Sequence, residues 1–174
     1  MIVVVDIVRK VVAATAKRYG GDVFFFHGHI REIASELTER SRTAEYRKQK
    51  YPCIMLLEDF RETHATGKAW DMEAALQLLI VASSDQNYTP DTRIEKVFAQ
   101  VLYPVYDAFI ESLKSSIHIQ SIPESNLKYQ KIDRHRCTSA FNEAAKSQGL
   151  ATLFADHLDA VELNLDLKLI ENCI

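Results

Sequence analysis

Two histidines near the start of the chain are the first residues whose types and spacing could do chemistry. His27 and His29 lie two positions apart, so an extended strand would place both imidazoles on one side, as metal ligands can be placed. No third ligand follows at a useful spacing, and Gly28 separates the pair. The favoured interpretation is therefore structural, with a metal site as the alternative.

A second group combines carboxylates with an imidazole near the end of an apolar stretch. Its members are Glu58, Asp59, Glu62 and His64. Such groups can form metal sites or acid–base pairs, but a solvated strand end has the same composition. A structural interpretation is favoured here too. If either group were functional, the chain would be a small metal- or ligand-binding domain or enzyme, with its site in a cleft beside a long helix.

The cysteines do not add a reactive centre. Cys53, Cys137 and Cys173 are odd in number and irregularly spaced, so they predict neither a disulfide framework nor a zinc site. Cys53 lies in an apolar stretch and is expected to be buried. Basic neighbours could lower the thiol pKa of Cys137, but no nucleophile signature surrounds it. The sequence also lacks phosphate-binding, dinucleotide-binding and hydrolase motifs, so we expect no catalytic residue, metal or cofactor, and no enzyme.

Aromatic and basic residues outside the apolar stretches are candidates for contacts with a partner protein. Trp70 follows a polar segment that contains Gly67, and it either holds this loop on a sheet or anchors a partner. A basic cluster lies near residue 130. The segment 40–50 is basic too; a solvated linker or helix end is favoured, with an electropositive contact surface as the alternative. The predicted interaction residues are Arg61, His64, Lys68, Trp70, Lys128, Lys131, Arg134 and Arg136.

Length and composition set the class of molecule. The chain has 174 residues, of which 47% are hydrophobic and 26% charged, which suits one globular domain over 1–174. The net charge of −3 provides no general attraction for nucleic acid or an anionic membrane. The apolar start is too short and too charged for a signal peptide or a membrane span. We therefore expect neither a membrane nor sequence-specific nucleic acid among the partners.

A long amphipathic helix, predicted over 92–115, organises the elements that position these residues. Its apolar residues recur at three- and four-residue steps, and Pro104 in its middle predicts a bend. Before it, apolar strands at 51–59 and 74–83 predict a hairpin with a long loop at 60–73. After it, the region 121–157 is predicted to be an irregular arm, interrupted by a possible short helix at 138–146.

The remaining elements complete an α+β prediction. Helices are expected over 4–18 and 30–42, and short strands over 22–26 and 117–120. The segment 159–170 alternates between apolar and polar residues, which predicts a strand with one face in the core and the other in water. The predicted fold is a mostly antiparallel sheet, with the long helix and the N-terminal helix packed on one side.

Three stretches resemble tail terminator, or tail completion, proteins of the neck of long-tailed bacteriophages, as found in phages and prophages of Bacteroides-type bacteria. They are YPCIMLLEDF at 51–60, the long segment at 76–113, and DHLDAVELNLDLKL at 156–169. The order of elements is similar as well: an N-terminal helix, a loop-linked pair of strands, a long helix and closing strands. The insert between Gln120 and His157 departs from the smallest members of that family.

The resemblance implies a structural virion protein, made in the bacterial cytoplasm and located in the tail or neck. Such proteins form a ring, typically of about six subunits, on the last ring of the tail tube. The implied partners are further copies of the chain, the tail tube protein and the head–tail connector proteins. The hairpin loop and the arm at 128–136 are the candidate contacts. Another head–tail connector or a tail-tube protein is the nearest alternative.

Overall fold

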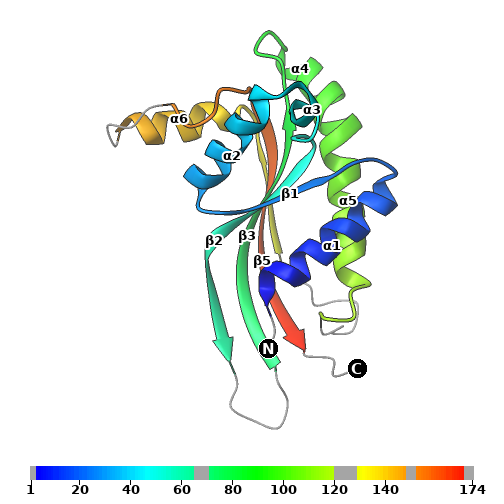
Figure 1. The fold of residues 1–174 in the computed structure, drawn as a ribbon. Coiled ribbons are helices and arrows are strands. Elements are labelled where there is room, and N and C mark those ends of the chain that lie inside the picture. Colours follow the sequence, from blue (N-terminus) through cyan, green and yellow to red (C-terminus); the bar gives the residue numbers. More distant parts are fainter. Residues whose placement is uncertain (1–2, 65–70, 120–128, 148–151, 171–174) are drawn as a thin grey trace.

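The computed structural model describes residues 3–64, 71–119, 129–147 and 152–170, and it has an α+β fold built on a mixed sheet (Figure 1). The strands lie in the order β1-β2-β3-β5-β4. β1 (Phe24–Gly28) runs parallel to β2 (Cys53–His64), and every other neighbouring pair is antiparallel. The others are β3 (Asp71–Ser83), β4 (Tyr129–Arg134) and β5 (Leu158–Ile170). The predicted α+β class with a mostly antiparallel sheet is confirmed.

Two helices cover one face of this sheet, as predicted. α1 (Val4–Tyr19) has its buried residues at helical spacing, and it ends at Gly20, whose φ of 77° forms a left-handed cap. The long helix packs beside it and consists of three consecutive segments (Figure 1). These are α4 (Pro90–Arg93), the π-helical η1 (Ile94–Leu102) and α5 (Tyr103–Lys114). The core on this face extends along β3 from Met72 to Ala82.

The irregularity predicted at Pro104 takes the form of a change in helix type. Proline has no N–H group, and its ring would clash with the carbonyl of Gln100 in a regular α-helix. The preceding turns are wider, with the N–H of Tyr103 donating to the carbonyl of Phe98 five residues earlier. Phe98 and Phe109 are nevertheless fully buried, so the apolar face continues through the proline.

Helices also pack against the opposite face, which the sequence did not predict. α2 (Ile30–Arg42) and α6 (Cys137–Ser147) enclose a second core, which reaches Leu79 and Val81 of β3 and Leu158 and Ala160 of β5. The short α3 (Ala44–Arg47) follows α2 and contributes no buried residue. Only one end of the sheet is therefore covered on both faces (Figure 1). We call the other end, at Met72 and Leu169, the hairpin end.

Three predicted boundaries are corrected. The loop expected at 60–73 is shorter, because β2 continues to His64, which pairs with Met72. The arm expected at 121–157 holds β4 and α6, and α6 confirms the helix predicted within it. The strand expected at 117–120 is wrong over its described residues, where Ile119 makes a single bridge to Leu169. Residue 120 lies outside the described residues.

The final strand differs from its prediction in one half. β5 is paired on both sides, with β3 along its length and with β4 over Ala160 to Leu165. Its second half alternates between buried and exposed residues, as predicted. Its first half is buried on both faces. Asp159 lies on the face of the long helix, where it binds Arg93, whereas Leu158 and Ala160 belong to the core under α2 and α6. Glu162 is buried among its hydrogen-bond donors Arg134, Gln77 and Asn164. In the described part of the chain, no helix is both long and apolar enough to cross a membrane.

A buried ion pair joins the start of the long helix to the start of β5. The guanidinium Nε of Arg93 lies 3.0 Å from a carboxylate oxygen of Asp159, with 5% and 0% of the two side chains exposed. The other carboxylate oxygen accepts the backbone N–H of Arg136 at 2.6 Å. Arg93 also donates to the carbonyl of Tyr88. Removing either charge would leave its partner uncompensated in a low-dielectric environment.

We predict that Arg93→Met or Asp159→Asn lowers the free energy of unfolding by about 3–5 kcal/mol, because each leaves a buried charge unpaired. The double variant Arg93→Met/Asp159→Asn should lose less than the sum of the two single losses. Urea unfolding followed by circular dichroism measures these changes. Arg9→Met, which breaks the exposed Arg9–Asp6 pair, is the control and should change little. Equal effects of Arg93→Met and Arg9→Met would contradict the assignment.

Candidate functional site

The face of the sheet that α2 and α6 leave uncovered is the main candidate site. Side chains alternate along β3 and β5, so Gln77 and Asn164 lie on this face while their neighbours Leu76 and Leu165 are buried on the other. A hollow of about 530 Å³ lies here. Its floor is formed by β2, β3 and β5, and its walls by the start of α2 and by β4.

Carboxylates give this hollow its charge. A bulge in β2 interrupts the register between Leu57 and Arg61, and it places Glu58 and Asp59 at the rim. Asp59 has a φ of 147°, a backbone conformation that side chains other than glycine rarely adopt. Asp166 completes the lining from β5. We call these three carboxylates, together with the amides of Gln77 and Asn164, the acidic hollow.

A hydrogen-bonded carboxylate lies next to the acidic hollow. Glu162 accepts hydrogen bonds from Arg134 at 2.7 Å, from Gln77 at 3.2 Å and from Asn164 at 3.2 Å. Burial alone would raise the pKa of the Glu162 carboxyl, but these donors outweigh it and hold the pKa below its usual value. The two amides of the acidic hollow are therefore held in position by a group that is charged at neutral pH.

The two histidines do not form a shared site. His29 caps α2. Its side-chain Nδ1 accepts the backbone N–H of Arg31, and its backbone N–H donates to the carboxylate of Glu32. His27 lies 3.3 Å from Glu58 and 3.5 Å from Arg9. Within the described ranges, no group of three or more His, Cys, Asp or Glu side chains is arranged to hold a metal ion.

The described residues of the acidic group at 58–64 and the cysteines Cys53 and Cys137 do not form a reactive site. Glu62 and His64 pair with each other at 3.1 Å on the exposed end of β2. Cys53 is fully buried, as predicted, and burial raises its pKa above the usual range. Burial likewise raises the pKa of Cys137 to about 12, so the basic neighbours do not produce a reactive thiolate.

The predicted interaction residues are not gathered into one patch. Arg61 and His64 lie toward the hairpin end of β2, opposite Ala75 and Met72. Lys131 and Arg134 are three positions apart on β4, so they point to opposite faces of the sheet.

Lys131 binds Asp133 and lies over the ring of Tyr103, whereas Arg134 binds Glu162. Arg136 has a φ of 51° and lies beside the buried Arg93–Asp159 pair. The other predicted interaction residues, Lys68, Trp70 and Lys128, fall outside the described residues.

Most of the acidic hollow was missed at the sequence level. Glu58 and Asp59 were recognised as candidates, but Gln77, Asn164 and Asp166 looked like ordinary polar positions of alternating strands. Their grouping depends on the strand order and on the bulge in β2, which no motif announces. Comparison of the chain with protein-family models and with curated proteins finds no match.

We predict that Glu162→Gln lowers the free energy of unfolding at about pH 7 by roughly 1–3 kcal/mol, because a charged acceptor of three hydrogen bonds is lost. The Glu162 pKa is lower in the folded than in the unfolded chain, so its stabilisation is lost as pH falls through the folded pKa. The difference between the variant and the wild type should therefore shrink as the solution is made more acidic. Urea unfolding along a series of falling pH values checks this; a difference that persists at the acid end would contradict it.

Proposed function

We propose that this chain is a structural protein of a long-tailed phage, which caps the tail tube as a ring and faces the head–tail connector. The proposal joins the sequence resemblance to one structural observation. The hairpin of β2 and β3 extends past the helices that cover one face of the sheet (Figure 1). A subunit of this shape offers its neighbours a sheet face and a strand edge that its own helices do not occupy.

The edge of β2 supports an assembly role. β1 ends where Gly28 pairs with Leu57. Beyond the bulge, from Arg61 to His64, the described residues pair β2 with β3 only. Unpaired backbone groups on such an edge can bind another chain. The edge carries charged side chains and a bulge, which are features that protect natural edges from unspecific pairing. An edge of this kind suits a selective neighbour better than open aggregation.

A ring requires a heterologous contact, in which two different surfaces of the same subunit meet. The acidic hollow adjoins the edge of β2 at Glu58 and Asp59, whereas the hairpin end lies further along the strands at Met72 and Leu169. The hollow and the hairpin end are therefore separate surfaces of one subunit. Each ring member would then bind its neighbours through one pair of surfaces and the tube through another. The hairpin end is the part we assign to the tube.

The test uses tail tubes assembled from the tube protein encoded in the same genome. Purified wild-type protein should bind one end of each tube as a ring and stop its growth, as seen by negative-stain electron microscopy and tube length. Wild-type protein that binds no tube end, or that binds along the tube wall, would contradict the proposed function.

We predict that Arg61→Glu reduces capping of tubes about tenfold, because it reverses a charge near the hairpin end. The matched control is Lys17→Glu, the same charge reversal on the exposed surface of α1. Capped ends are counted in micrographs at a fixed protein concentration. Equal capping by both variants would show that Arg61 at the hairpin end does not contribute to the tube contact. It would leave the proposed ring itself untested by this variant pair.

A further inference from the structure

The corner after α2 is exposed and carries basic and aromatic side chains. Tyr46 on α3 is 49% exposed, and no residue of α3 is buried in the core. Arg47 and Lys48 follow it and are exposed. The guanidinium of Arg47 donates twice to the carbonyl of Ser41, at 3.2 and 3.0 Å, which fixes its direction. We call Tyr46, Arg47 and Lys48 the α3 knob.

The charges in the segment that holds the α3 knob are mainly positive. Residues 40–50 contain five lysines and arginines and one acidic residue, Glu45. Some of these cations have partners in the same chain: Arg40 binds Glu36, and Lys50 is buried against Asp156. The knob itself keeps its positive charge at the surface. Tyrosine and arginine are also the residue types that most often anchor protein interfaces.

The acidic hollow has the complementary properties. It is concave, it carries the carboxylates of Glu58, Asp59 and Asp166, and its amides can donate and accept hydrogen bonds. A hollow of about 530 Å³ is in the range of pockets that bury most of a bound group. Tyr46 could enter it with its ring, while Arg47 and Lys48 meet the carboxylates at the rim.

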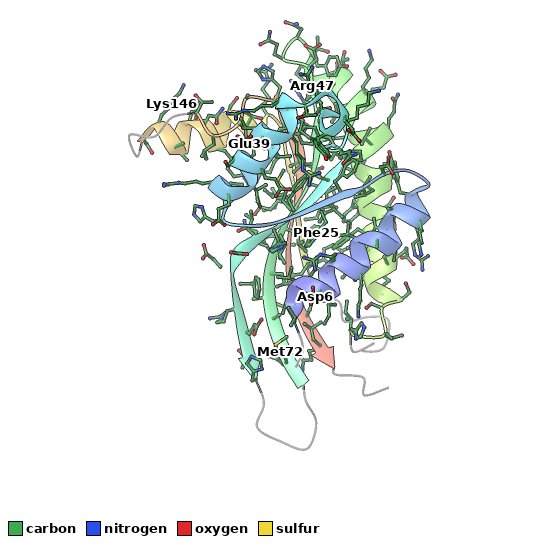
Figure 2. The ribbon with its side chains drawn as sticks, viewed as in Figure 1. Asp6, Phe25, Glu39, Arg47, Met72 and Lys146 are labelled. Carbon is green, nitrogen blue, oxygen red and sulfur yellow. The ribbon has the colours of Figure 1, made fainter. Side chains whose placement is uncertain are left out.

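One subunit cannot satisfy both surfaces by itself. Arg47 lies at one end of the molecule and Met72 at the other (Figure 2). The acidic hollow is lined by the start of α2 and by the middle of β3, at Ala75, Leu76 and Gln77, so it lies between them. A knob in one place and a hollow in another, both on the same chain, form the two halves of a heterologous contact.

We propose that the α3 knob of one copy docks into the acidic hollow of the next copy. This inference rests on the proposed ring function and names the surfaces that close the ring. Opposite charges steer the two copies into register, and Tyr46 supplies the apolar contact. The contact weakens as salt rises, because the rim charges are solvent-exposed and are screened over about 8 Å at physiological ionic strength.

The test uses two variants of the full chain. The knob variant is Tyr46→Ala/Arg47→Ala, and the hollow variant is Glu58→Lys/Asp166→Lys. Mass photometry and sedimentation equilibrium measure self-association over a concentration series. Each variant should raise the dissociation constant of self-association at least about 100-fold. The knob variant loses an anchor residue, and the hollow variant places like charges opposite each other.

The matched control, Ile94→Ala/Lys96→Ala, removes an exposed large side chain and a cation outside both surfaces. It should associate as the wild type does. Circular dichroism and the urea midpoint confirm that each variant is folded. If the hollow variant does not fold, Glu58→Gln/Asp166→Asn replaces it, with a smaller expected loss.

Mixing the two variants tests whether the knob of one copy binds the hollow of another. The knob variant keeps an intact hollow and the hollow variant keeps an intact knob, so an equimolar mixture has one competent interface. The mixture should form a heterodimer and grow no further. The wild type separates a heterologous contact from a symmetric one, because a two-fold contact would stop at a dimer.

Three results would overturn the proposal: association of either variant equal to that of the wild type, no heterodimer in the mixture, or wild-type protein that stays monomeric up to about 1 mM. If the wild type stays monomeric but binds a lysine- and arginine-rich peptide in the acidic hollow, the hollow is a binding site for another protein. Variants that still form rings and cap tubes would contradict the knob–hollow contact but not the proposed function. Wild-type protein that neither self-associates nor caps tubes would contradict both.

Discussion

The antiparallel pairing of β3 with β5 is the constraint on which the rest of the structure depends. The two strands pair from Asp71 with Ile170 to Ser83 with Leu158. On one face of this pair, alternate apolar residues from Met72 to Ala82 and from Val161 to Leu169 belong to the core that includes α1 and the long helix. Because β5 is the last strand and β3 belongs to the hairpin, this pairing joins distant parts of the chain and fixes which polar residues share the other face.

Uneven cover of the sheet follows from that pairing. α1 and the long helix span one face, whereas α2 and α6 cover only the end near Ser83 and Leu158. Polar residues on the uncovered part of the second face, such as Gln77 and Asn164, therefore avoid the cost of burying unpaired groups. The same unevenness leaves a hollow and a strand edge free, and our proposals for assembly start from these two features.

The elements were largely predictable from the sequence, whereas their grouping was not. Periodicity identified both α1 and the long helix, and the alternation after Asp159 identified β5. The burial of Asp159 and Glu162 was not predictable, because it depends on partners that are distant in sequence: Arg93 for Asp159, and Gln77 and Arg134 for Glu162. The acidic hollow was missed for a similar reason. Strand order and the bulge at Asp59 bring its residues together, and neither can be predicted from the pattern of polar residues along the sequence.

The most direct test of the central claim is the mass of the assembled state, measured by mass photometry with the wild-type protein alone and on the ends of isolated tail tubes. A structural ring protein should reach one closed species of several identical subunits, about six if it follows the phage proteins that it resembles. A monomer or a two-fold dimer as the final state under both conditions would contradict the account.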